Sequence, residues 1–139
     1  MDTTKQPEWR EITDSAFNSH VGPIRFARVN ETTWLAELVL TPKHMNKGGV
    51  CHGGVYMTLA DVAMGAAAFE AGGNQPCATV DFDAHFLAAA KLGQVLLATA
   101  RLNRLVSGIC FMECELTAGG RTCLRASGIW KYLSKRKAG

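Results

Sequence analysis

The stretch from Val55 to Phe69 constrains the fold of this chain more than any other segment. Apolar residues recur along it at intervals of three and four, which is the spacing of one helical face: Val55, Leu59, Val62, Ala66 and Phe69. The opposite face is also small and apolar, with Ala60, Met64, Ala67 and Ala68. A helix that is apolar almost all round has to be buried. The rest of the chain must therefore surround it.

The remainder of the chain predicts a sheet that can do so. Patterns typical of β-strands cover residues 24–29, 33–40, 78–86, 93–105, 108–117 and 121–133. Strict alternation within 78–86 predicts that one sheet face carries Val80, Phe82, Ala84 and Phe86. It predicts that the other face carries Thr79, Asp81, Asp83 and His85. We therefore expect an α+β fold in which a six-stranded antiparallel sheet covers one long helix.

The two ends of the chain differ from this middle part. Residues 1–23 have a short helical pattern closed by Gly22-Pro23, and residues 134–139 form a basic tail. No internal repeat or linker divides the 139 residues, so we expect residues 1–139 to form a single domain.

Composition excludes several classes of function. The net charge of +3 suits an anionic small molecule and is far from a nucleic-acid-binding profile. No apolar stretch approaches the ~20 residues that a bilayer demands, and no secretory signal is visible. The five cysteines form an odd set without a CxxC pair, which argues against a disulfide framework. We expect a cytoplasmic protein with neither nucleic acid nor membrane as a partner.

Residues 43–54 hold the most informative motif. This segment has four glycines in twelve positions, so it predicts a loop. His52-Gly53-Gly54 stands where the loop becomes the helix, and the first backbone N–H groups of a helix have no intrahelical partner. Glycine lets a ligand oxygen approach these groups, whose partial positive charge suits an oxyanion. Asp61 lies about two turns further on, where a carboxylate is unfavourable unless it is hydrogen-bonded, solvated or chemically useful.

Together these residues resemble a known family, the hotdog-fold acyl-CoA thioesterases of the phenylacetate-degradation type. The shared pattern is Asn46-x5-His52-Gly53-Gly54-x6-Asp61, followed by Met64-Gly65. Thr79 opens the third predicted strand, where the family places a Ser or Thr. Phe86-Leu87-Ala88 with Gly93 after it is similar to the family's turn between strands. The resemblance covers roughly residues 24–133 and implies the hotdog fold, a six-stranded antiparallel sheet wrapped around one central helix.

The resemblance also implies a role for each motif residue. Asp61 is expected to be the catalytic carboxylate, as nucleophile or general base. The backbone N–H of Gly53 is expected to form the oxyanion hole. Asn46 would orient the thioester or water, His52 would support the loop, and Thr79 would hold the water or Asp61. The expected substrate-binding residues are Gly54, Val80, Asp81, Phe82, Arg101 and Arg104.

The implied activity is hydrolysis of a small or medium acyl- or aryl-CoA thioester to the free acid and CoA, without metal or cofactor. In this family the sites form at a homodimer interface, so Asp61 of one chain would face Asn46 and Gly53 of the other. A dimer of dimers is a further possible assembly. Arg101, Arg104, Lys91 and Lys131 are candidates for the CoA phosphates, and ordinary surface charge is the alternative.

Other interpretations of the same residues remain open. Cys51, His52, Cys77 and His85 could be drawn as a zinc set, but their spacing fits no standard pattern. A cysteine nucleophile with a histidine base is a second alternative. Asp81 and Asp83 are expected to be solvated or interface groups. At the level of function, the alternatives are a hotdog dehydratase or hydratase and a non-catalytic module that binds acyl-CoA.

Overall fold

The computed structural model describes residues 6–13 and 16–134. Its helices are α1 (Phe17–Val21) and α2 (Gly53–Ala71), with a short 3-10 turn over Pro42–His44. Its strands are β1 (Arg10–Glu11), β2 (Arg25–Arg28), β3 (Thr33–Val39), β4 (Cys77–Phe86), β5 (Val95–Val106), β6 (Ile109–Ala118) and β7 (Arg121–Tyr132). No helix within the described ranges is long and apolar enough to cross a membrane.

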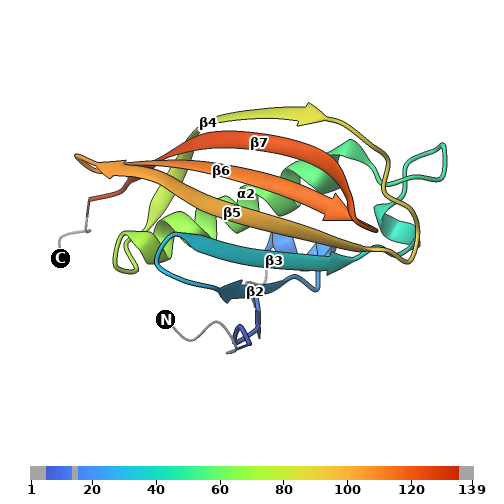
Figure 1. Cartoon of the computed structure of the whole chain (residues 1–139), viewed down its shortest axis with the longest axis horizontal. Coiled ribbons are helices and arrows are strands. Elements are labelled where there is room, and N and C mark those ends of the chain that lie inside the picture. The colour runs from blue at the N-terminus through green and yellow to red at the C-terminus, as the bar shows by residue number, and fades with distance from the viewer. Residues whose placement is uncertain (1–5, 14–15, 135–139) are drawn as a thin grey trace.

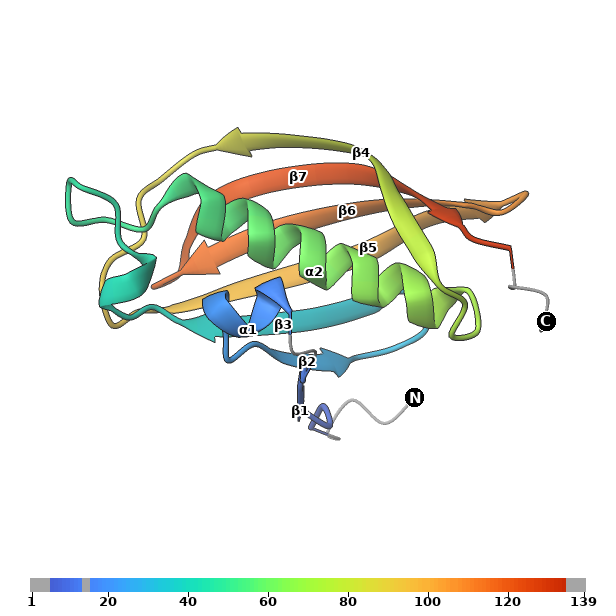
Figure 2. The same ribbon diagram turned by 180° about the vertical axis from the view of Figure 1, so that it is seen from behind.

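The strands form one antiparallel sheet that curves around α2. The sheet order is β1-β2-β3-β5-β6-β7-β4, so β1 and β4 are the edge strands. Figure 1 shows β4 along one edge of the sheet, next to β7. Seen from behind, α2 lies along the concave face of the sheet, and the short helix α1 lies beside it (Figure 2). The α+β architecture predicted from the sequence is confirmed, with one long helix against an antiparallel sheet.

The N-terminal segment differs from its predicted helical pattern. Arg10 and Glu11 form the seventh strand, β1, because their backbones pair with Phe26 and Arg25 of β2. Among the described residues of this segment, the helix covers Phe17–Val21 alone. Both residues of β1 are exposed, so no apolar alternation marks this strand in the sequence. Residues 1–5 and 14–15 of the predicted lead-in, and all of the predicted basic tail except Ser134, lie outside the described residues.

Small residues let α2 pack closely against the sheet. The buried residues of the helix are Tyr56, Leu59, Ala60, Ala63, Met64, Ala67 and Ala68, which face inner residues of the sheet such as Trp34, Leu96, Leu116 and Trp130. At its C-terminal end the helix stops at Gly72, where a Cβ atom would lie 2.3 Å from the Tyr132 ring. The Tyr132 hydroxyl donates a hydrogen bond of 2.6 Å to the Ala68 carbonyl. The close approach of β7 therefore requires glycine at the helix end.

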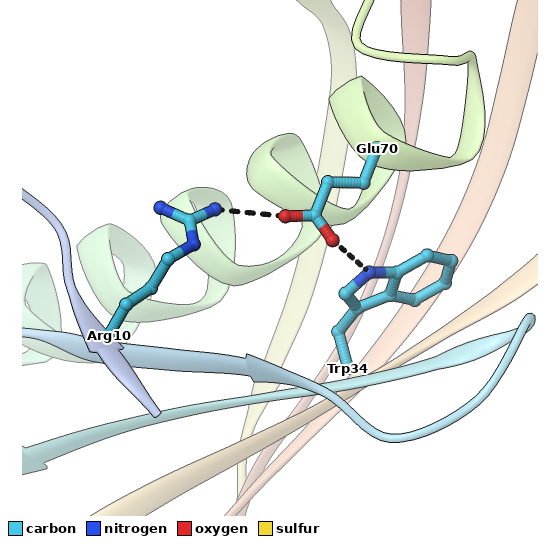
Figure 3. A network of polar contacts seen from close by, with 3 residues as sticks. All are labelled: Arg10, Trp34 and Glu70. Atoms are coloured by element: carbon cyan, nitrogen blue, oxygen red, sulfur yellow. Dashed lines mark hydrogen bonds and ion pairs between the residues drawn. The ribbon is translucent and has the colours of Figure 1, made fainter. Parts of the chain in front are cut away.

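Polar contacts of Glu70 join the C-terminal end of α2 to the N-terminal strands. Glu70 accepts a hydrogen bond from Trp34 Nε1 (3.1 Å) and forms an ion pair with Arg10 Nη2 (2.9 Å) (Figure 3). A carboxylate in the last turn of a helix is disfavoured by the helix dipole. The two donors offset this effect and tie β1 and β3 to α2.

Strand β4 contains a β-bulge that changes which residues face the helix. Thr79 pairs with Trp130 of β7, but Asp81 pairs with Ile129, so Val80 is an extra residue in the ladder. Thr79 consequently shares the helix-facing side of the sheet with Phe82, because directly paired residues point to the same face. The predicted strict alternation was wrong at this point: Val80 is 62% exposed, and the Thr79 hydroxyl faces Asp61 of α2.

Candidate active site

Asp61 and Thr79 meet where α2 passes the start of β4. Thr79 Oγ1 donates a hydrogen bond of 2.8 Å to Asp61 Oδ1. The helix brings the carboxylate to this point, and the bulge at Val80 turns the Thr79 hydroxyl toward it. Asp61 is half-buried. The structure thus joins two of the residues that the motif placed in the site, and it joins them directly.

A pocket of about 410 Å³ opens beside this pair. Apolar groups from α2 and the neighbouring strands form most of its wall, which includes Val62, Gly65, Ala66, Phe69, Pro76, Cys77 and Trp130. Ile12 and Asn18 from the N-terminal segment complete the lining. The volume lies in the range of small-molecule sites, and an apolar wall with a few polar groups is typical of them. The pocket can hold an apolar group next to the Asp61 carboxylate.

Of these lining residues, sequence reasoning placed only Asp61 and Thr79 in the thioesterase site. Ile12 and Asn18 lie outside the region of family resemblance, and Pro76 and Cys77 precede the motif threonine. The signal for Trp130 was indirect: Gly128 precedes it by two residues on the same face of β7, which leaves room for a large ring.

The start of α2 forms a second part of the candidate site. His52 is the N-cap residue, and its Nδ1 accepts a hydrogen bond of 2.8 Å from the Gly54 N–H. A Cβ atom on Gly54 would lie 3.0 Å from that nitrogen, so glycine is what lets the ring cap the helix. No hydrogen bond to the Gly53 N–H is found among the described residues. This N–H is therefore available to an oxygen atom of a ligand.

Asn46 shapes the loop that precedes the helix. Its Oδ1 accepts hydrogen bonds from the backbone N–H groups of Gly48 (2.8 Å) and Val50 (3.2 Å). The buried His44 supports the same loop, since its carbonyl accepts a hydrogen bond from the His52 N–H (2.8 Å) and its ring contacts the Val21 carbonyl. Sequence reasoning did not single out His44. These contacts give Asn46 a structural role, and its predicted contact with substrate stays a prediction.

The structure does not bring the predicted basic residues together around Asp61. Arg101 lies on the sheet face away from α2, paired with Glu113. Arg104 is exposed on β5, and Lys131 is exposed on β7. Lys91 is different, because its backbone bridges to Val50 beside the Asn46 loop. On β4, Asp81 is exposed beside Ile129, and Phe82 is half-buried on the helix side.

The thiols near the site are held in the protonated form. Burial, with a smaller contribution from Cys123, raises the pKa of the Cys51 thiol to about 11. Burial also raises the pKa of the Cys77 thiol, followed by the charges of Cys110 and Asp61. A nucleophilic cysteine needs a lowered pKa, so both shifts argue against cysteine chemistry here. Within residues 6–13 and 16–134, no group of three or more His, Cys, Asp or Glu side chains could hold a metal ion.

The match to a known protein family covers residues of the candidate site. The family described as the Thioesterase superfamily matches residues 48–124, a range that includes the start of α2, Asp61 and Thr79. The chain belongs to the thioesterase superfamily. The Pseudomonas aeruginosa protein PA0474, which is named provisionally as an esterase, is 33% identical over 111 residues, which make up 79% of this chain and 83% of that protein. This member of the superfamily is therefore placed among hydrolases of esters or thioesters.

Solved structures share the fold of this thioesterase-superfamily chain. Zebrafish Thioesterase Superfamily Member 2 has a TM-score of 0.77 at 25% identity and covers 87% of this chain and 89% of its own. The E. coli PaaI protein from the phenylacetic acid degradation operon has a TM-score of 0.69 at 21% identity over 73% of each chain. A hypothetical thioesterase of Streptococcus pneumoniae with coenzyme A has a TM-score of 0.74 at 21% identity, covering 82% and 88%. The predicted hotdog thioesterase fold, similar to PaaI, is confirmed.

Proposed function

We propose that this protein hydrolyses a small or medium acyl- or aryl-CoA thioester, with Asp61 as the catalytic carboxylate. The observation that carries the proposal is the Thr79–Asp61 hydrogen bond at the mouth of an apolar pocket. Thr79 fixes Oδ1 and leaves Oδ2 to take a proton from water or to attack the carbonyl carbon. A fixed carboxylate beside a pocket for an apolar acyl group suits either route.

The second element of the chemistry is an oxyanion site at the Gly53 N–H. Gly53 and Asp61 are eight residues apart on one helix, so they lie ~12 Å apart along its axis. One thioester carbonyl cannot contact both groups within a single chain. We infer that each site combines Asp61 of one chain with Gly53 and Asn46 of a second copy.

The sheet offers a place for that second copy. Strand β4 is an edge strand of ten residues, and β7 is its only partner among the described strands. A long open edge pairs readily with another strand, and a closed twofold arrangement would give two identical composite sites. A homodimer is thus the proposed active unit, with a dimer of dimers as a larger assembly. We place the activity in the cytoplasm, where thiols such as the five free cysteines stay reduced.

Coenzyme A is the proposed carrier of the acyl group. The S. pneumoniae structure with coenzyme A supports this choice through its shared fold. Lys91 beside the Asn46 loop is the basic residue best placed for a CoA phosphate. If basic residues bind the phosphates, KM for acyl-CoA will rise with salt more than KM for the matching acyl-pantetheine. If salt raised the two KM values equally, phosphate binding by basic residues would be contradicted.

A panel of acyl-CoA substrates tests the function directly. Free thiol should be released by the wild-type protein and not by a binding module, which is the alternative without catalysis. Asp61→Asn keeps the size of the side chain but removes the carboxylate, so kcat should fall by about 100-fold or more while substrate binding persists. Near-wild-type turnover by this variant would remove Asp61 from the mechanism. Conversion of an enoyl-CoA to its hydrate without thiol release would favour the hydratase alternative.

A further inference from the structure

Trp130 is a buried residue whose indole N–H has no hydrogen-bond partner among the described residues. Trp130 is 1% exposed, and no hydrogen bond from its Nε1 is found in the described part of the chain. Trp34 is equally buried, but its Nε1 donates to Glu70 (Figure 3). Buried tryptophans usually find such a partner. The donor on Trp130 is therefore an exception that needs an explanation.

The unpartnered N–H opens onto the pocket beside Asp61. No side-chain nitrogen or oxygen among the described residues is both sealed from solvent and unpaired, so Trp130 Nε1 cannot be sealed. Trp130 lines the Asp61 pocket together with Gly65. A Cβ atom on Gly65 would lie 3.3 Å from Nε1, which places the N–H next to the bare backbone of α2.

Two glycines fix the direction of this donor. A Cβ atom on Gly128 would lie 2.6 Å from Cζ3 and Cη2 of Trp130, so the six-membered ring lies directly over Gly128. The nitrogen end of the indole lies at Gly65 on the facing helix. The ring therefore lies between the bare backbones of Gly128 on β7 and Gly65 on α2. A rigid donor in an apolar pocket is a feature that selects ligands.

We propose that Trp130 determines substrate specificity by donating a hydrogen bond to an oxygen acceptor on the acyl group. This inference rests on the proposed function. Gly65 lies one helical turn beyond Asp61, which is ~6 Å along the helix axis. The acceptor should therefore lie four or five carbons from the thioester carbonyl. An unsubstituted acyl chain would cover the N–H without pairing it, which makes such a chain the poorer substrate.

The test compares hexanoyl-CoA with 5-oxohexanoyl-CoA, which differ only by a ketone oxygen at the fifth carbon. The wild-type kcat/KM, measured by thiol release, should be about 10-fold or more higher for the keto substrate. Trp130→Phe removes the donor and should bring the ratio close to one while hexanoyl-CoA is still hydrolysed. Gly65→Ala should also lower the ratio, because its methyl group would partly cover Nε1. Trp34→Phe is the matched control and should keep the wild-type ratio.

The outcomes separate this inference from the proposed function. Thiol release from both substrates without a preference in the wild type would overturn the role of Trp130 alone. An equal loss for both substrates in Trp130→Phe would also overturn it, because the N–H would then act on the thioester carbonyl or on water. If Trp130→Phe fails to fold, the ratio of the two kcat/KM values in Gly65→Ala decides whether the Trp130 N–H sets the preference. Absence of thiol release from every acyl-CoA would instead contradict the function itself.

Discussion

Thr79 reaches Asp61 because strand β4 contains one extra residue. The Thr79 hydroxyl lies 2.8 Å from Asp61 Oδ1, and the bulge at Val80 puts that hydroxyl on the helix side of the sheet. In a regular strand, Thr79 would share the face of Asp81 and Asp83 and point away from α2. Bulges of this kind re-aim side chains next to active sites.

The first prediction concerns this hydroxyl. Thr79→Val keeps the shape of the side chain but removes the donor to Asp61, so kcat should fall by about 10-fold with little change in KM. Thr79→Ser retains the hydroxyl and should retain most of the activity. Steady-state thiol release with one acyl-CoA measures both variants. An unchanged kcat in Thr79→Val would show that the hydrogen bond does not serve catalysis.

The composite site predicts complementation between two inactive variants. Asp61→Ala and Asn46→Ala should each abolish activity, but a mixed dimer would contain one site with neither change. Random co-assembly makes about half of the dimers mixed, and half of their sites are intact. Co-expression should therefore restore about a quarter of wild-type activity. Mixed dimers that form and stay inactive would show that each site is built within a single chain.

The cap at the start of α2 predicts a structural role for His52. His52→Ala removes the acceptor for the Gly54 N–H and should lower the free energy of unfolding by about 1 kcal/mol. Asn is a good N-cap residue, so His52→Asn should restore most of that loss. Urea denaturation followed by circular dichroism checks both. Equal destabilisation by the two substitutions would contradict capping as the role of this ring.

Glu70 should matter more for stability than its exposed partner Arg10. Glu70→Ala leaves the buried Trp34 N–H without an acceptor and should cost about 2 kcal/mol of unfolding free energy. Glu70→Gln keeps an acceptor and should cost about 1 kcal/mol or less. Arg10→Ala removes only an ion pair whose Arg10 side chain is 57% exposed and should cost less than Glu70→Ala. A larger effect of Arg10→Ala than of Glu70→Ala would reverse this order.

The raised pKa of Cys51 predicts a loss of stability at alkaline pH. The thiol has its ordinary pKa of 9.0 in the unfolded chain, whereas burial raises the folded-state pKa to about 11. The protonated Cys51 thiol therefore makes its full contribution to the free energy of unfolding below pH 9. This contribution is lost as the pH rises toward 11, because only the unfolded chain releases the proton in that range. The free energy of unfolding, measured from pH 8 to 11, should fall less steeply in Cys51→Ala. An identical slope in that variant would exclude Cys51 as a source of the pH dependence.

Local sequence patterns predicted most of the secondary structure. The apolar periodicity from Val55 to Phe69 identified α2, which extends only two residues further at each end. The six predicted strands correspond to β2–β7 within a few residues. Strand β1 was missed because its two residues are held by backbone pairing and carry no apolar alternation. Periodicity reports which side chains are buried, and it is silent where only the backbone is paired.

The sequence by itself determined the buried helix, the antiparallel strands and the motif that places Asp61 two turns beyond His52-Gly53-Gly54, because these depend on residues close together in the chain. The tertiary structure alone decided that Val80 bulges out of β4 and that Thr79 meets Asp61. It also decided that Ile12 and Trp130 line the same pocket. Pairing register and close approach between distant segments depend on how α2 and the sheet pack together. No local pattern contains that information.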